Sequence, residues 1–151
     1  MLKDTKYKGF SLIEILIVVG LILILAAVTI VAINPAKHFR DTRNAERSAD
    51  VSEILNAVTQ FTAEDGNTLA DLQITDQTIP ACKTNPEDPD RWTDAAEIST
   101  VVDTGKLAPA YIVEIPVDPD GSDYRICETG EGRVQILAEK EGENELIVAT
   151  R

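Results

Sequence analysis

Apolar side chains are concentrated in one run near the start of the chain, over residues 12–33. Within this run only Glu14, Gly20 and Thr29 are not plainly apolar. As a helix rising about 1.5 Å per residue, the run is about 33 Å long, enough to cross a hydrocarbon core of about 30 Å. The apolar core of an ordinary secretory signal is shorter, at about 7 to 15 residues. The pattern therefore predicts a membrane-spanning helix.

A second, amphipathic helix is predicted directly after this run. Asn34 and Pro35 mark its start, because Asn is favoured at the N-cap and Pro at the first helical position. Residues 36–65 follow, with apolar side chains at spacings of three and four that predict one buried face. This stripe consists of Val51, Ile54, Leu55, Val58, Phe61 and Thr62. We expect hinges at Gly20 and at Asn34 and Pro35.

The remainder of the chain predicts loops followed by an antiparallel sheet. Residues 68–94 are rich in Asp, Thr, Pro and Asn and indicate mostly loop, with Trp92 as a packing residue, and a short helix is possible over 95–103. Four segments with strand character follow: 111–115, 124–127, 134–139 and 146–150. A Gly-containing turn over 141–144 separates the last two, which favours a hairpin. The fold class is therefore α+β.

Length and charge restrict the possible partners. The 151 residues suffice for one domain plus an appendage, and the formal net charge is −12. The acidic excess falls beyond residue 33, which argues against nucleic-acid binding because phosphate contacts need a basic patch. Neighbouring copies of such a domain would repel one another. Salt, divalent ions or internal basic residues would have to offset this repulsion in a polymer. The basic residues that could do so by facing acidic surfaces of neighbours are Lys37, Arg40, Arg43 and Arg47.

The two cysteines, Cys82 and Cys127, both lie beyond the apolar run. In an exported domain they would meet oxidants, so a disulfide is the natural interpretation. Such a bond stabilises a domain by about 4 kcal/mol in the chain-entropy model. Two unpaired buried thiols are the alternative, and no C-x-x-C spacing indicates metal or redox chemistry.

The motifs of common enzymes are missing from the sequence. His38 is the sole histidine, and neither a Gly-rich phosphate loop nor a nucleophile elbow occurs. A hydrolase that uses two carboxylates is formally possible, but abundant acidic residues do not make a catalytic pair. We expect a protein that is not an enzyme.

Glu14 is the most informative residue of the apolar run. A charge deep in a membrane costs roughly 2.5 to 3.5 kcal/mol, so such residues usually have a partner and a function. A carboxylate near the interface could instead reach the polar headgroups. The preceding residues bear on the choice: Lys3, Lys6 and Lys8 form a basic leader, and Gly9 then meets Phe10.

This arrangement over residues 8–33 resembles the type IV pilin and pseudopilin family. The resemblance implies that a membrane prepilin peptidase cuts between Gly9 and Phe10 and that the new amine of Phe10 is methylated. It also implies that Glu14 pairs with the terminal amine of a neighbouring subunit. Burying either charge alone would be costly, so the pair would select the correct register.

The resemblance implies a domain organisation and a set of partners. Residues 1–9 are the leader that is removed, 10–33 the membrane and assembly helix, 34–66 its amphipathic continuation, and 67–151 the globular head. The prepilin is expected to be a single-pass membrane protein. An ATPase and a membrane platform would then assemble it into a helical homopolymer.

Beyond residue 33 the resemblance is looser. Many pilins have a proline inside the apolar run, whereas here Pro35 lies past it. Residues 115–121 resemble a Pro-x-Asp-Pro-x-Gly turn of major pseudopilins, some of which bind calcium. Asp118, Asp120 and Asp123 have oxygen ligands suited to calcium. Their spacing fits no EF-hand, and the alternative is a turn closed by local hydrogen bonds.

Three functions follow from these observations. The favoured one is a subunit of an extracellular type IV pilus, because the predicted disulfide and the acidic head suit surface exposure. A periplasmic pseudopilus of a type II secretion-like system is the second, indicated by the Asp-Pro turn. The third is a monomeric binding domain that uses the apolar helix only as an anchor.

Overall fold

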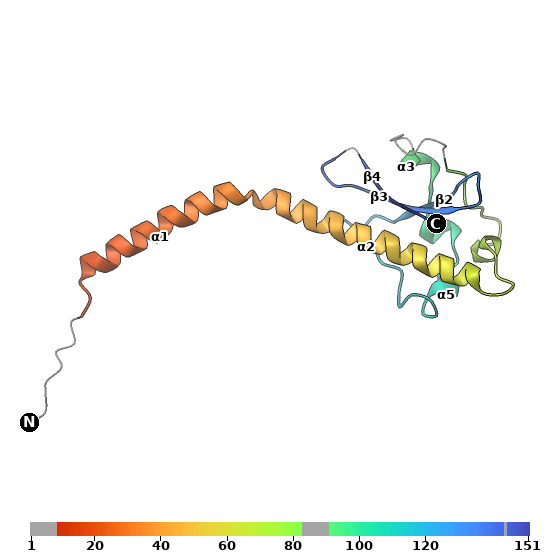
Figure 1. The fold of residues 1–151 in the computed structure, drawn as a ribbon, viewed down its shortest axis with the longest axis horizontal. Coiled ribbons are helices and arrows are strands. Elements are labelled where there is room, and N and C mark those ends of the chain that lie inside the picture. Colours follow the sequence, from red (N-terminus) through yellow and green to blue (C-terminus); the bar gives the residue numbers. More distant parts are fainter. Residues whose placement is uncertain (1–8, 83–90, 144) are drawn as a thin grey trace, which may run out of the picture. The chain divides into compact units, whose positions relative to one another are not determined.

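The computed structural model describes residues 9–82, 91–143 and 145–151 of the chain. It divides into two compact units, Met1–Phe39 and Arg40–Arg151. Two long helices open the described chain, α1 over Leu12–Ile33 and α2 over Pro35–Ala63 (Figure 1). The apolar run predicted α1 and the spacing of apolar residues predicted α2, and the expected α+β class is confirmed.

The second unit contains a four-stranded antiparallel sheet in the order β1-β2-β3-β4. Strand β1 covers only Ala96–Glu97, whereas β2 (Arg125–Glu128), β3 (Val134–Glu139) and β4 (Leu146–Thr150) form a meander. The β3–β4 hairpin confirms the prediction; Asn144 of its expected turn lies outside the described residues.

Short helices connect these elements. The 3-10 helix η1 spans Leu69–Leu72 and α3 spans Arg91–Asp94, both inside the predicted loop, of which residues 83–90 lie outside the description. Helices α4 (Ile98–Val101) and α5 (Thr104–Leu107) follow β1.

Both faces of the sheet are covered. On one face, Ile126 and Ile136 pack with the stripe of α2, including Val51, Ile54 and Val58, in the main core. The alternating residues of the same strands, such as Cys127 and Leu137, turn to a smaller cluster that holds Cys82. The period-two alternation of strands places these two sets on opposite faces.

Trp92 packs against this smaller cluster, as expected of a packing residue. Its ring lies under the guanidinium carbon of Arg125, which is 4.6 Å from the ring centroid. The arrangement is a cation–π contact.

One predicted element is wrong and another is only partly right. Residues 111–115 form turns rather than a strand, because the N–H groups of Tyr111 and Ile112 both donate to the carbonyl of Leu107, at 2.8 and 3.3 Å. These N–H groups are therefore not available for hydrogen bonds to a neighbouring strand. The helix expected over 95–103 is shortened to α4, because Ala96 and Glu97 pair with β2 instead.

Candidate functional site

The predicted processing site precedes the first turn of α1. Gly9 and Phe10 lie outside the helix, and the side chain of Phe10 is 79% exposed. Ser11 is the N-cap, with extended backbone, and its carbonyl accepts hydrogen bonds from Glu14 and Ile15 at 3.1 and 3.2 Å. The junction between residues 9 and 10 is therefore exposed chain outside the helix. The leader lysines lie outside the described residues.

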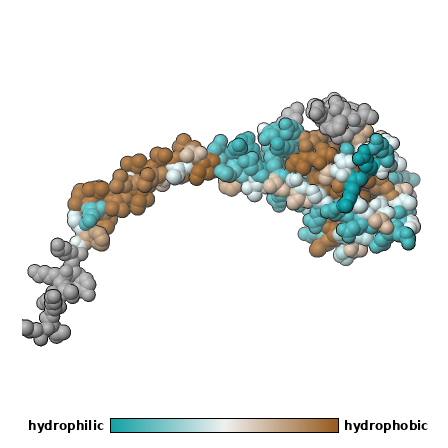
Figure 2. Space-filling view, in the orientation of Figure 1, coloured by the Kyte–Doolittle hydropathy of each residue, from teal (hydrophilic) through white to brown (hydrophobic). Residues whose placement is uncertain are grey.

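The side chains of α1 are exposed in the described part of the chain. None of its residues is buried, and the face of α1 drawn in Figure 2 is mostly apolar. Its length and mean hydropathy are sufficient to cross a membrane. The hydroxyl of Thr29 donates to the carbonyls of Leu25 and Ala26 at 3.0 and 2.9 Å, so this polar group is satisfied inside the helix. Such a helix needs lipid or other chains around it.

Glu14 stands in the first turn of α1 and is exposed. The positive end of the helix dipole favours a carboxylate there. Among the described residues its side chain makes no hydrogen bond or ion pair. Whatever partner Glu14 requires in an apolar environment must therefore come from outside the described part of the chain.

The break between α1 and α2 occurs at Asn34, whereas α1 runs unbroken through Gly20. Asn34 has left-handed backbone, with φ 48° and ψ 74°, which Asn tolerates better than most residues. Its side-chain oxygen accepts from the N–H of Lys37 at 3.4 Å. Pro35 disfavours helical backbone at the residue before it, so the pair ends one helix and starts the next.

The structure pairs Cys82 with Cys127, with their Cα atoms 5.0 Å apart. Asp118, Asp120 and Asp123, in contrast, do not form a metal-ligand cluster in the structure. Within the described residues there is no cluster of three or more side chains suited to a metal ion.

The physical reason lies in what these aspartates bind. The carboxylate of Asp118 is buried and accepts two hydrogen bonds from Arg47, at 2.6 and 2.7 Å. That of Asp123 accepts from the backbone N–H of Ser99 at 3.0 Å. Asp120 accepts from the N–H of Ser122 at 2.9 Å, and this bond is the main cause that lowers its pKa.

The predicted role of the basic residues needs correction for Arg47. Arg47 is buried, 2% exposed, and Arg43 forms an ion pair with Glu141 of the same head. Burial excludes Arg47 from a contact with neighbours, whereas Arg43 is engaged by Glu141 and stays partly exposed. The sequence analysis did not identify Arg47 as a buried residue. Its position was a signal, because it lies four residues before Val51 on the buried stripe of α2.

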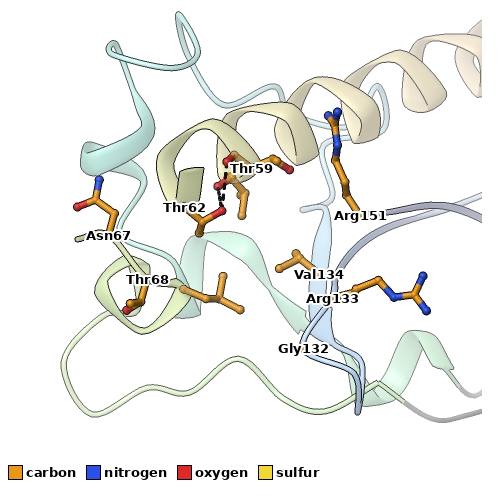
Figure 3. A pocket seen from close by; sticks show the side chains of 10 residues that line it. Thr59, Thr62, Asn67, Thr68, Gly132, Arg133, Val134 and Arg151 are labelled. Carbon is orange, nitrogen blue, oxygen red and sulfur yellow. Dashed lines mark hydrogen bonds between the residues drawn. The ribbon is translucent and has the colours of Figure 1, made fainter. Parts of the chain in front are cut away.

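A pocket lies between the C-terminal part of α2 and the end of the sheet at which β3 begins (Figure 3). Val58 and Val134 contribute apolar surface. The hydroxyls of Thr59 and Thr62 donate to carbonyls of their own helix. No set of side chains suited to catalysis lines this pocket.

Comparison with known families supports the interpretation of the first segment. Residues 4–30 match the family described as the prokaryotic N-terminal methylation motif, which is the prepilin signal of type IV pilins and pseudopilins. The rest of the chain lies outside this match. No curated protein and no solved structure matches the chain. The motif indicates a pilin-like or pseudopilin-like structural protein, processed by a peptidase and anchored in the membrane as a precursor.

Proposed function

We propose that this chain is the structural subunit of a type IV pilus. The prepilin would be cut after Gly9, methylated at Phe10, and polymerised through α1. The observation that carries the proposal is the combination of the methylation motif with a helix that has no buried residue. Lipid would cover this helix in the precursor, and copies of the same helix would cover it in the filament.

Glu14 has a defined task in this proposal. After cleavage the amine of Phe10 would be a positive charge near the start of the helix, and Glu14 of a neighbouring copy would be its counterion. An unpaired charge in an apolar filament core costs several kcal/mol, so only a register that satisfies both groups would be stable.

Mass spectrometry of the native protein tests the processing step. A mature chain that begins at methylated Phe10 is expected. An intact chain that begins at Met1 would contradict the proposal and favour a monomeric anchored domain.

The assembly step is tested by Glu14→Ala in cells that make no wild-type chain. We expect filaments to be lost while the chain still accumulates in the membrane. Glu53→Ala is the matched control, because Glu53 is an exposed carboxylate on α2. Filaments as abundant with Glu14→Ala as with the wild type would refute the pairing.

A periplasmic pseudopilus is the second candidate, favoured by the Asp-Pro turn that ends in Gly121. Imaging of cells with label against the head distinguishes the two. Surface filaments at normal expression support a pilus, and their absence alongside methylated mature chain supports a pseudopilus.

A further inference from the structure

The guanidinium of Arg47 is the centre of a polar cluster inside the head. Its Nε and Nη2 donate to the two carboxylate oxygens of Asp118, and Nη2 also donates to Asp120 at 3.3 Å. On the other side, Nη1 donates to the side-chain oxygen of Asn44 at 3.1 Å and lies 3.6 Å from Glu141. Three carboxylates and one amide thus surround a single buried cation.

The first of these carboxylates belongs to a tight turn that starts at Asp118. The N–H of Gly121 donates to the carbonyl of Asp118 at 2.8 Å, and the N–H of Asp120 donates to its side chain at 3.0 Å. Gly121 has φ +86°, a backbone conformation that favours glycine. Arg47 therefore holds a complete turn, and not only one side chain, against α2.

The tip of the β3–β4 hairpin is the second segment held by this cluster. The side chain of Asn44 accepts from the N–H of Glu141 at 2.8 Å and donates to its carbonyl at 3.2 Å. Arg43 pairs with the carboxylate of the same residue. The turn and the hairpin tip are distant in sequence, and both attach to α2 within the short span 43–47.

Carboxylates gathered in this way repel one another and need a cation among them. Proteins often supply a divalent ion to a set of oxygens of this kind. Here the position is taken by a guanidinium, which stays protonated at any physiological pH.

We propose that Arg47 is a permanent cation that holds the 118–121 turn and the β3–β4 tip against α2 through ion pairs and hydrogen bonds, so that neither loop depends on a dissociable metal. A bound ion leaves when its concentration falls, whereas Arg47 is covalently part of α2. The head therefore keeps its two loops in place whatever the concentration of divalent ions outside the cell. This inference does not require that the chain polymerises.

The test uses the full-length chain in detergent, with thermal unfolding followed in EDTA and in millimolar calcium at matched ionic strength. The wild type is expected to melt at the same temperature in both. Arg47→Met keeps much of the side-chain volume but leaves the carboxylates without their cation. We expect its melting temperature to fall by on the order of 10 °C in EDTA and to rise again in calcium.

Three further variants make the outcome decisive. Arg47→Lys keeps the charge and should melt between the wild type and Arg47→Met, without a calcium response. Arg47→Met combined with Asp118→Asn relieves the repulsion and should also lose the calcium response. Arg133→Met removes an exposed arginine that pairs with Glu131 and should leave melting unchanged. A calcium-dependent melting temperature in the wild type, or Arg47→Met as stable as the wild type, would overturn the proposal.

Discussion

At the scale of residues, two charged side chains have opposite surroundings. Arg47 is buried and satisfied by its own chain through Asp118, a residue 71 positions away. Glu14 is exposed and makes no ion pair among the described residues. A buried charge that is fully paired fixes the structure of one molecule, whereas the charge of Glu14 finds no partner among the described residues. Sequence analysis singled out Glu14, whose pairing stays a prediction, and missed Arg47.

Tyr124 offers a prediction at the same scale. It is completely buried, and its hydroxyl donates to the carboxylate of Asp50 at 2.6 Å. Tyr124→Phe keeps the ring but leaves that carboxylate without its donor. We expect the free energy of unfolding to fall by about 1 to 3 kcal/mol, measured by urea denaturation of the full-length chain in detergent.

The pH dependence of the same pair has a defined sign. Burial, followed by the hydrogen bond to Asp50, raises the pKa of Tyr124 above its ordinary value. The folded state therefore favours the protonated hydroxyl of Tyr124. Its contribution to the free energy of unfolding is fully present below the pKa of an unfolded tyrosine, about 10, and is lost as the pH rises beyond it. Tyr124→Phe should therefore lose less stability than the wild type between neutral and strongly alkaline pH. Equal losses in both proteins would contradict this assignment.

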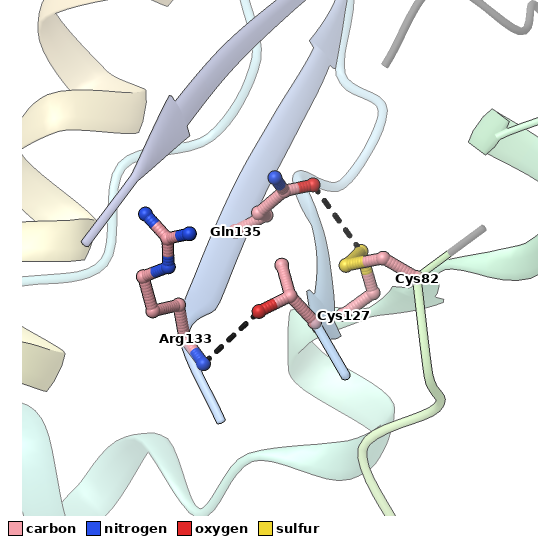
Figure 4. The surroundings of a disulfide bond; sticks show 5 residues. Cys82, Cys127, Arg133 and Gln135 are labelled. Carbon is pink, nitrogen blue, oxygen red and sulfur yellow. Dashed lines mark hydrogen bonds between the residues drawn. A yellow bond between two sulfur atoms is a disulfide. The ribbon is translucent and has the colours of Figure 1, made fainter. Parts of the chain in front are cut away.

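At the scale of elements, a short segment around Ala81 pairs with the end of β2, although it belongs to none of the four strands. The N–H of Cys82 donates to the carbonyl of Glu128 at 2.7 Å, and the N–H of Glu128 donates to the carbonyl of Pro80 at 2.8 Å. The disulfide joins this segment to β2 (Figure 4). Two backbone hydrogen bonds are a weak attachment alone, so the disulfide is expected to hold the segment in place.

Replacing both Cys82 and Cys127 by Ala tests this expectation. Removal of a native disulfide from a small domain typically costs about 2 to 5 kcal/mol of stability, which should appear as a lower urea midpoint. Faster cleavage by protease near residue 82 should accompany it. Reduction of the wild type should reproduce both effects, and an unchanged midpoint in the double variant would show that the two hydrogen bonds suffice.

Elements with strong periodicity were predictable from the sequence. The apolar run predicted α1, the three-and-four spacing predicted α2, and the turn chemistry predicted the β3–β4 hairpin. In each case the residues that determine the structure are close together in the sequence. The break at Asn34 and Pro35 was predictable for a similar reason, because both residues have strong local preferences.

The elements that were wrong depend on partners distant in sequence. Residues 111–115 have strand composition, but the turn after α5 uses the N–H groups of Tyr111 and Ile112. Ala96 and Glu97 join the sheet because β2 has a free edge there. The role of Arg47 was hidden for the same reason, since its main partner lies in a different segment. Local propensity does not contain this information.

At the scale of the whole molecule, the chain separates into two compact units, Met1–Phe39 and Arg40–Arg151. Every buried apolar residue of the described chain lies in the second unit, from Val51 onward, and α1 contributes none. Hydrophobic burial is the main favourable term in folding, so the stability of the head should not depend on α1.

A fragment of residues 35–151 tests this division, because it keeps α2 whole and removes α1. We expect it to remain in aqueous solution without detergent, to sediment as a monomer, and to melt within a few degrees of the full-length chain in detergent. Its net charge is strongly negative, which favours the monomer. The full-length chain should instead need detergent, since α1 exposes many large apolar side chains. A fragment that is unfolded, or that self-associates as strongly as the full chain, would show that α1 contributes to the fold or that the head also drives assembly.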